Sequence, residues 1–414
     1  MTFAGQLTHR YVGGELRFLA TEYADGAHNL IEFRLPSGAA DGRTIGVSQK
    51  TNSWAGPSVW PTFSGSPLAG HHHGISWDEA KGGLWGSFGI DYAGSGEQVG
   101  ITRAITFRTL NSNGTVSNHV GPWGFQGVSQ RCVMGKVLAV PGWAQTAHGI
   151  GPYLYGFGGY TSLIAQGGTG SLGLFAASGP DVTGLSASSG YPYGSGQGAD
   201  FNVPSSAFSI VADHRGGTGY SDWYDGESQY RDRGIRSANV VNYCDLIDQS
   251  QALPGAPPVG DPTRARSYRW QSPAPDGKGR FVYGDSYFAT PCIVSGPSKS
   301  GLVCIMSAAE GKAYYNASAL NSTSAGAEIH AFSLADIGSA KAGQIPNWSV
   351  QPVAIKRITD EMTGIGMVFP SRQRELGGAV GATFDETTKK LWVAFTGFDN
   401  GGYGCALVCY DVNC

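Results

Sequence analysis

The pattern of hydrophobic and polar positions is clearest near the end of the chain, over Gly381–Phe395. It begins as an alternating strand, turns after Asp385, and continues as five residues without a polar interruption, Leu391–Phe395. A half-buried strand alternates apolar and polar residues, whereas a strand that is apolar on both faces is covered on both sides. This stretch therefore predicts a β-hairpin whose second strand lies inside the protein.

The same frame occurs a second time, over Gly74–Phe88. Both copies place a Gly first, then a small or apolar residue, Ser or Thr, an aromatic residue and Asp-Glu. A short turn containing Lys follows, then Leu-Trp and a Phe three residues after that Trp. Two copies of so long a frame indicate an internal repeat.

Strand patterns and turns divide the chain into repeated units, in which a hairpin is followed by a loop and an amphipathic outer strand. No segment shows sustained helical periodicity. Units of four strands repeated in this way predict an all-β fold, a single-domain β-propeller of about six or seven four-stranded blades spanning residues 1–414. The unit near residue 127 is expected to turn at Met134-Gly135, and Cys405–Tyr410 to close the ring against the N-terminal unit. The blade hairpins are expected to start near residues 6, 74, 127, 205, 289 and 379.

The units are longer than common propeller repeats of about 40–50 residues. Long inserted loops at residues 213–236 and 253–278, or a divergent seventh blade, would account for the difference. The 64 Gly among 414 residues agree with many short strands joined by turns.

Two parts of the chain resemble bacterial and phage-associated propeller sequences of uncharacterised activity. One is Gly279–Asp336, where Gly279-Arg-Phe-Val-Tyr-Gly284-Asp285 precedes a hairpin, and the other is Gly381–Asp411. The resemblance implies the propeller fold and carries no activity.

Charge and hydropathy exclude some partners. The net charge of −3 provides no basic surface for nucleic acid, and no apolar run reaches the roughly 18 residues that predict a membrane span. The N-terminus lacks the basic start and apolar core of a signal peptide. We therefore expect cytoplasmic synthesis, with incorporation into a virus particle as one route outward, or an extracellular location if a leader has been removed.

The segment Asp213–Arg236 interleaves charged and aromatic residues. Aromatic faces stack on sugar rings, while Asp and Arg hydrogen-bond hydroxyl and carboxylate groups, and the same residue types are enriched at protein contacts. A glycan site, a protein contact and a solvated loop all remain open. The candidate ligand-binding residues are Trp223, Tyr224, Asp225, Tyr230, Arg231, Arg233 and Arg236.

Three adjacent histidines, His71, His72 and His73, form a second candidate. Adjacent residues on an extended chain alternate sides, so at most two could bind one metal ion, and a further ligand would be needed. Packing in the channel wall, catalysis and metal binding all remain open. No metal or other cofactor is expected, although calcium could bind at the acidic turns Asp276–Gly279 and Asp399–Gly402.

Cys292 and Cys304 flank a turn centred near Ser298, and hairpin pairing would bring them roughly opposite each other. They are interpreted as buried thiols, with a cross-strand disulfide as the alternative.

Two functions are compatible with the sequence. The first is a non-catalytic propeller, a rigid structural or binding module on the exterior of a virus particle or cell, contacting glycan or protein subunits through its loops. The second is a polysaccharide lyase, an activity that some propellers have. His72 or His73 and Tyr224 or Tyr230 would then transfer protons, while Arg231 or Arg233 would neutralise a uronate carboxylate. No lyase motif matches residue by residue, which favours the first function.

Overall fold

The computed structural model describes strands, turns and short helices over about half of the chain. Sheet 1 contains β1 (Phe3–Val12), β2 (Glu15–Ala24), β3 (Ala27–Arg34) and β4 (Gln49–Trp54). Sheet 2 contains β5 (His72–Asp78), β6 (Gly83–Phe88), β7 (Ile105–Leu110) and β8 (Val116–Phe125). The described residues are 3–24, 27–36, 49–54, 72–88, 105–125, 135–162, 169–178, 202–203, 205–213, 287–316, 319–345, 350, 352–358, 378–396 and 405–412.

The second half of the chain adds three sheets. Sheet 3 contains β9 (Gly135–Ala139), β10 (Tyr153–Ser162), β11 (Thr169–Ala177) and β13 (Phe208–Asp213). Sheet 4 contains β14 (Tyr287–Ser295), β15 (Ser300–Asn316), β16 (Ala319–Phe332) and β17 (Pro352–Arg357). Sheet 5 contains β18 (Gly378–Asp385), β19 (Lys390–Thr396) and β20 (Cys405–Asp411).

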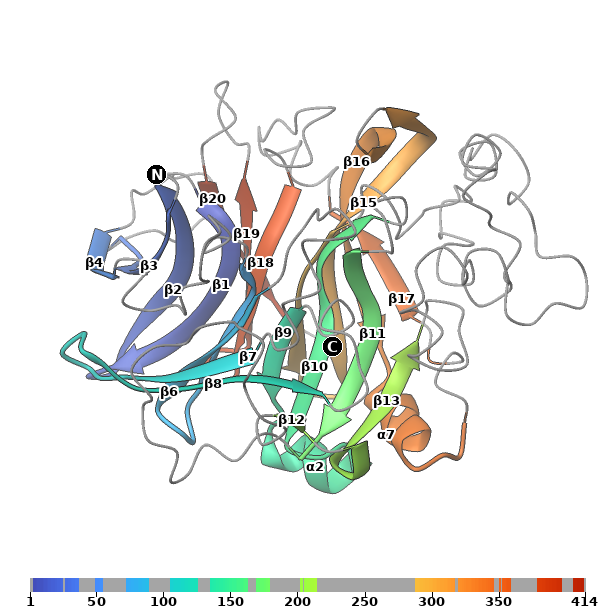
Figure 1. Ribbon diagram of the computed structural model, residues 1–414, viewed down its shortest axis with the longest axis horizontal. Helices are drawn as coiled ribbons and strands as arrows, with labels where there is room; N and C mark the ends of the chain where they lie inside the picture. The colour runs from blue at the N-terminus through green and yellow to red at the C-terminus, as the bar shows by residue number, and fades with distance from the viewer. Residues whose placement is uncertain are drawn as a thin grey trace, which may run out of the picture.

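Neighbouring strands within each of the five sheets are antiparallel and follow one another along the chain, except that β12 lies between β11 and β13, so each sheet is a meander (Figure 1). Two pairings go beyond this scheme. The short strand β12 (Asn202–Val203) runs parallel to β8, and β10 pairs with β14 at Gly159–Phe288 and Tyr160–Tyr287, which joins sheets 3 and 4.

The five sheets form a ring. Their first strands contact one another in a closed cycle, β1 to β5, β5 to β9, β9 to β14, β14 to β18 and β18 back to β1. The prediction of an all-β, propeller-like repeat architecture is confirmed, and sheets 1 to 4 each supply four strands that follow one another in a blade.

The expected count of six or seven four-stranded blades is wrong for the described residues, which form five sheets, the last with three strands. The segment near residue 205 does not begin its own unit. It supplies β13, which pairs with β11 as the outermost strand of sheet 3. The turn expected at Met134-Gly135 falls at the limit of the described residues, because Met134 lies outside them, and β9, which starts at Gly135, pairs with β10 after an intervening helix.

Two short α-helices occur among the described residues, together with a 3₁₀ turn at Ser205–Ala207. Helix α2 (Gly142–His148) ends at Gly149 in the left-handed conformation, the usual C-terminal arrangement of a glycine. Helix α7 (Leu334–Lys341) is capped by Ser333, whose side chain accepts a hydrogen bond from the Asp336 amide. Both helices are too short to show the periodicity that identifies a helix in a sequence.

The hairpin turns follow from residues that tolerate a positive φ. Gly13 and Gly14 lie between β1 and β2 with φ of 59° and 83°, the conformation of a two-residue hairpin turn. Gly82 has φ of 60° before β6, and Lys389 has φ of 57° at the matching place before β19. The two repeated frames therefore fold into the same turn with different residues at the left-handed position.

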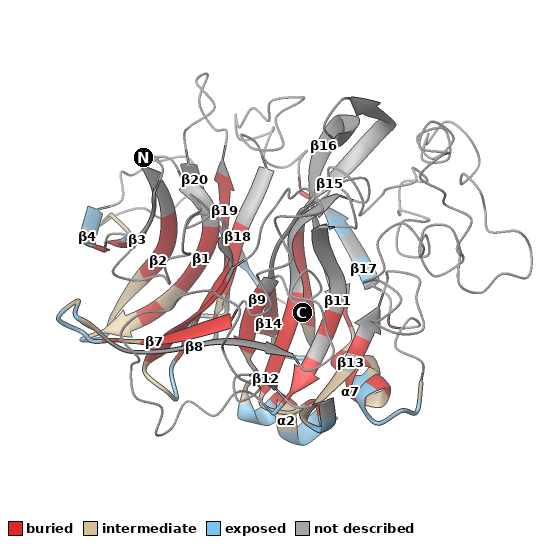
Figure 2. Ribbon diagram, viewed as in Figure 1, coloured by how far each residue is buried: buried red, intermediate tan, exposed pale blue. Residues whose placement is uncertain are grey.

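The core consists of apolar clusters between neighbouring sheets (Figure 2). Between sheets 5 and 1, Leu7 and Phe18 pack against Trp392 and Ala394, with Leu407 of β20 at the edge. Burial of each large apolar side chain stabilises the fold by roughly 1.5–3 kcal/mol. Sheet 5 therefore closes the ring through β18 and β19, which contact β1, whereas the expected closing strand Cys405–Tyr410 pairs with β19 and reaches this cluster through Leu407.

The ring closes tightly at Gly381. A Cβ atom built there would lie 2.7 Å from the Leu7 amide nitrogen and 2.9 Å from the Leu7 Cβ. The Gly of the repeated frame is needed because the backbones of β18 and β1 approach each other too closely for a side chain.

Candidate functional site on the inner strands

Side chains of β1 alternate between two neighbouring sheets. The Thr8 hydroxyl accepts a hydrogen bond from the Trp77 amide of sheet 2 at 2.9 Å, and Arg10 reaches the same sheet. His9 and Tyr11 point the other way and contact Thr383 and Asp385 of sheet 5. The period of two along a strand therefore places alternate polar residues of β1 in two different interfaces.

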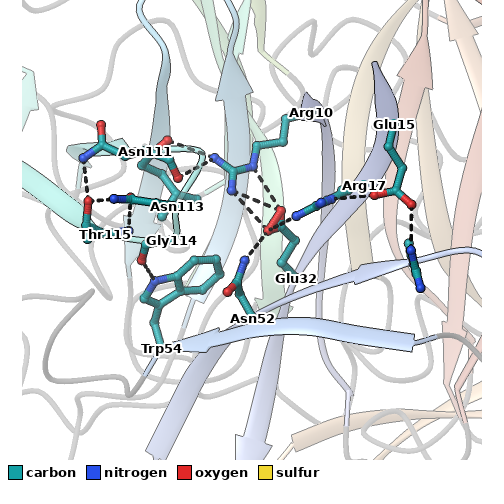
Figure 3. Close-up of polar contacts among 12 residues, drawn as sticks. Arg10, Glu15, Arg17, Glu32, Asn52, Trp54, Asn111, Asn113, Gly114 and Thr115 are labelled. Carbon is teal, nitrogen blue, oxygen red and sulfur yellow. Dashed lines mark hydrogen bonds and ion pairs between the residues drawn. The ribbon is translucent and has the colours of Figure 1, made fainter. Parts of the chain in front are cut away.

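Arg10 is the centre of a buried network between sheets 1 and 2 (Figure 3). Its Nε and Nη2 atoms donate to the carboxylate of Glu32 at 3.0–3.3 Å, and both side chains are 2% exposed or less. Its Nη1 donates to the carbonyl oxygens of Leu110 and Asn111 in sheet 2 at 2.9 and 3.3 Å. The guanidinium thus neutralises a carboxylate of its own sheet and satisfies backbone acceptors of the next.

Other groups complete the Glu32 side of this network. Asn52 of β4 donates to Glu32 at 2.8 Å, and Arg17 of β2 lies 3.6 Å from it. The Trp54 indole donates to the Gly114 carbonyl across the same interface (Figure 3). A buried ion pair is tolerated when its remaining donors and acceptors are satisfied, which these contacts achieve.

Asp78 and Asp385, the carboxylates of the two repeated turns, have the same role in different sheets. Asp78 accepts hydrogen bonds from Tyr153 of sheet 3 at 2.9 Å and from the Trp85 indole at 3.1 Å. Asp385 accepts from Tyr11 of sheet 1 at 2.8 Å and from Thr388 at 2.5 Å. Each carboxylate therefore binds its own turn and a tyrosine hydroxyl of the following sheet.

The hydrogen bonds between the two tyrosines and the two carboxylates are accompanied by shifted pKa values. Burial, together with the Asp78 carboxylate, raises the pKa of Tyr153, and burial together with the Asp385 hydrogen bond raises that of Tyr11. Burial alone would raise the pKa of Asp385, but the hydrogen bonds from Thr388 and Tyr11 outweigh it and lower the value. Asp385 is therefore held as a carboxylate.

His9 lies beside this contact. Its Nδ1 lies 2.7 Å from the Thr383 hydroxyl, and its ring meets that of Tyr11 edge to face at 6.3 Å. Burial lowers the pKa of His9 to about 4, with Asp385 opposing the shift and Lys136 adding to it. At neutral pH the imidazole is uncharged.

Lys136 of β9 reaches across the interior of the ring. Its buried ammonium donates to the carbonyl oxygens of Ala382 at 2.9 Å and Leu7 at 3.4 Å, which belong to the first strands of sheets 5 and 1. Burial lowers the pKa of Lys136. First strands leave one edge without a ladder partner, and this lysine satisfies carbonyl groups on two of those edges.

Metal binding receives no support from the part of the chain that the structure describes, where no group of three His, Cys, Asp or Glu could hold an ion. The possible calcium turns Asp276–Gly279 and Asp399–Gly402 lie outside the described residues, so they remain predictions.

Most of the sequence-predicted site residues also lie outside the described residues. This applies to Trp223, Tyr224, Asp225 and the others up to Arg236, and to His71. His72 and His73 begin β5, where the His72 backbone pairs with Phe88, and their side chains are outside the description. The structure neither joins these residues in one site nor separates them.

The two cysteines of the β14–β15 hairpin are described, and both are buried free thiols. Cys292 pairs with Val303, and Cys304 pairs with Pro291. Directly opposed residues share a face, so this offset of one residue places the two thiols on opposite faces of the sheet. Burial raises the pKa of both thiols.

Sequence reasoning did not identify Arg10, Glu32 and Lys136. The available signal was a charged residue at a strand position where the alternation calls for a buried one. Arg10 also follows a Thr by two residues, as Asp78 follows Ser76 and Asp385 follows Thr383. Aligning the first strands of the units on this Ser or Thr would have matched Arg10 with the two turn carboxylates.

Comparison with known proteins adds no assignment: no protein-family model, curated protein or solved structure matches the chain. Among the described residues, no helix is long and apolar enough to cross a membrane.

Proposed function

We propose that the chain is a rigid, non-catalytic β-propeller that serves as a structural or binding module of a larger assembly and contacts glycan or protein through its loops. One observation carries the proposal. The ionisable groups described on the inner strands are engaged in contacts between sheets: Arg10 with sheet 2, Asp78 with sheet 3, Asp385 with sheet 1, and Lys136 with sheets 1 and 5. Polar groups committed in this way support a scaffold.

The topology indicates where a ligand would be presented. Because strands alternate in direction, the connection from β13 to β14 begins and ends on one rim. Helices α2 and α7 and the short β1–β2, β5–β6 and β18–β19 turns lie at the opposite rim (Figure 1). The longest connection runs from Asp213 to Tyr287 and contains the charged, aromatic segment. Loops held on a rigid scaffold are the usual carriers of binding residues.

The residue types of this segment favour a glycan or a protein partner. Trp223, Tyr224 and Tyr230 offer aromatic faces for sugar rings, and Arg231 and Arg233 offer paired donors for carboxylates. The same residues are enriched at the centres of protein interfaces. Attachment to the exterior of a virus particle or cell would expose such a loop to either partner.

The test is a glycan array with neutral and uronate-containing glycans, together with binding to subunits that copurify from the native source. The variant Trp223→Ala/Tyr224→Ala/Arg231→Ala is expected to lose binding. The control variant Trp143→Ala removes an exposed aromatic side chain from α2 on the opposite rim and is expected to bind normally. Absence of both glycan and subunit binding by the unmodified protein would contradict the proposal.

The same preparations decide between binding and catalysis. A lyase would produce unsaturated uronate, which absorbs in the ultraviolet, and His72→Ala, Tyr230→Ala or Arg233→Ala would abolish that signal. Product formation that depends on these residues would replace the binding proposal with the enzymatic one.

A further inference from the structure

Strand β20 differs from the corresponding strand of every other sheet. The third strands β3, β7, β11 and β16 are each followed by a fourth strand that pairs with them, namely β4, β8, β13 and β17. Sheet 5 ends at β20, and no described strand pairs with its outer edge. An uncovered edge presents a row of backbone donors and acceptors to any strand that approaches.

The hydrogen-bond pattern identifies which residues of β20 present these groups. The Val412 amide donates to the Lys389 carbonyl at 3.1 Å, so Lys389 and Val412 form a hydrogen-bonded pair. Such pairs recur at every second residue of an antiparallel ladder. With Leu391 opposite Tyr410 and Val393 opposite Val408, the even-numbered residues face β19. The backbone groups facing outward are those of Cys405, Leu407, Cys409 and Asp411.

This edge lacks the features that usually protect an edge strand from pairing. The outer strand β17 carries Pro352, Lys356 and Arg357, and β4 carries Lys50. Proline and lysine on an edge discourage pairing with another chain. In contrast, β20 reads Cys-Ala-Leu-Val-Cys-Tyr-Asp, with one charged residue at its end, and Cys409 is exposed.

The arrangement of outward groups is self-complementary. If two copies of β20 run antiparallel about an axis at Val408, Cys405 lies opposite Asp411 and Leu407 opposite Cys409. All four outward residues of each copy then form hydrogen-bonded pairs, which gives roughly eight bonds between the chains. The two Asp411 carboxylates lie at opposite ends of the pairing, so the only charges on the edge do not repel each other.

We propose that the outer edge of β20 is an interaction surface for a second copy of this chain, which joins the two fifth sheets into one continuous antiparallel sheet across a twofold axis. An interface of this kind uses the same patch on both subunits. The proposal concerns a different surface from the loops described above and does not depend on glycan or subunit binding by those loops.

The register makes a prediction about Cys409. In the pairing centred on Val408, the two Cys409 Cα atoms are separated by one strand spacing and two residues along the strand, roughly 8–9 Å. A disulfide requires less than about 7 Å between Cα atoms. The dimer is therefore held by strand pairing, and a reducing agent should leave it intact.

The test is sedimentation velocity of the full chain across a concentration series under reducing conditions. Cys409→Pro removes an outward amide and leaves the ladder to β19 untouched, which is the position where an edge strand accepts proline. Cys409→Ser is the matched control, because it removes the thiol and keeps the amide. The unmodified protein and Cys409→Ser are expected to sediment as dimers, and Cys409→Pro as a monomer with an unchanged far-ultraviolet circular dichroism spectrum.

Two results would overturn the proposal: a monomeric unmodified protein throughout the series, or a dimer that persists in Cys409→Pro. If Cys409→Pro fails to fold, Asp411→Pro tests the same edge, because its amide also faces outward and lies at the end of the strand. Loss of the dimer in that variant supports the pairing, and its persistence contradicts it.

Discussion

Arg10 and Asp385 occupy the same place in the first strands of their sheets, yet they carry opposite charges. Each lies two residues after a threonine whose side chain already contacts the next sheet, Thr8 with Trp77 and Thr383 with His9. The difference follows from what the neighbouring sheet offers. Sheet 2 presents carbonyl oxygens, which require a donor, whereas sheet 1 presents the Tyr11 hydroxyl, which suits an acceptor.

The consequences for burial also differ. The cation of Arg10 lies 2% exposed and needs the Glu32 carboxylate beside it. Asp385 needs no cation, because Thr387, Thr388 and Tyr11 supply donors from its own turn and from the next sheet. The same position in the repeat therefore accepts either charge. The buried cation needs a buried carboxylate beside it, whereas the carboxylate is satisfied by neutral hydrogen-bond donors.

Among the changes that test this comparison, replacement of Arg10 should have the largest effect on stability. Arg10→Met leaves Glu32 buried without its principal partner, and the free energy of unfolding should fall by about 3–5 kcal/mol. Arg34→Met removes an exposed partner of Glu15 and should cost less than about 1 kcal/mol. Chemical denaturation measures both, and equal losses would contradict a structural role for the buried pair.

The free energy of unfolding should depend less on the contacts of Asp385 than on those of Arg10. Tyr11→Phe removes one donor, and Thr387 and Thr388 remain, so the free energy of unfolding should fall by about 1–2 kcal/mol. Tyr153→Phe makes the same change at Asp78. Because Tyr153 is only 6% exposed, water cannot replace its hydroxyl, and the free energy of unfolding should fall by more than in Tyr11→Phe. The reverse order, measured by denaturation, would contradict the argument that burial of the tyrosine sets the size of the loss.

The smallest effect concerns pH. His9 has a pKa of about 4 in the folded protein and 6.5 ordinarily, so between these values the unfolded chain binds a proton that the folded one does not. Stability should therefore fall as the pH is lowered from about 6.5 toward 4, by on the order of 1 kcal/mol given the partial exposure of the ring. In His9→Gln this slope should be reduced, as measured by thermal unfolding across the pH range. An unchanged slope would assign the pH dependence to other groups.

The sequence predicted the repeated hairpin well because its signals are local. The Asp-Glu turn, the following Lys and the apolar strand Leu391–Phe395 all belong to one short stretch, and β18–β19 and β5–β6 form as expected. The number of sheets was not predictable in the same way. Strand β13 has the same alternation as the start of a unit, and only its pairing with β11 shows that it ends one.

The pairing register of the β14–β15 hairpin could not be predicted from the sequence for a similar reason. A turn centred on Ser298 would have placed Cys292 opposite Cys304, whereas the hairpin closes with Ser295 opposite Ser300. This shift of one residue moves a side chain to the other face of the sheet. The contacts of Arg10 and Lys136 join residues a hundred or more positions apart, and no local pattern specifies such partners.

Native-state hydrogen exchange on the inner strands tests the closed ring most directly. If contacts between first strands close the ring, amides of β1 and β18, near the two ends of the described chain, should exchange only through global unfolding, with the same free energy as amides of β5, β9 and β14. Exchange of β1 or β18 through local opening, at a clearly lower free energy than the other three strands, would contradict the closed ring.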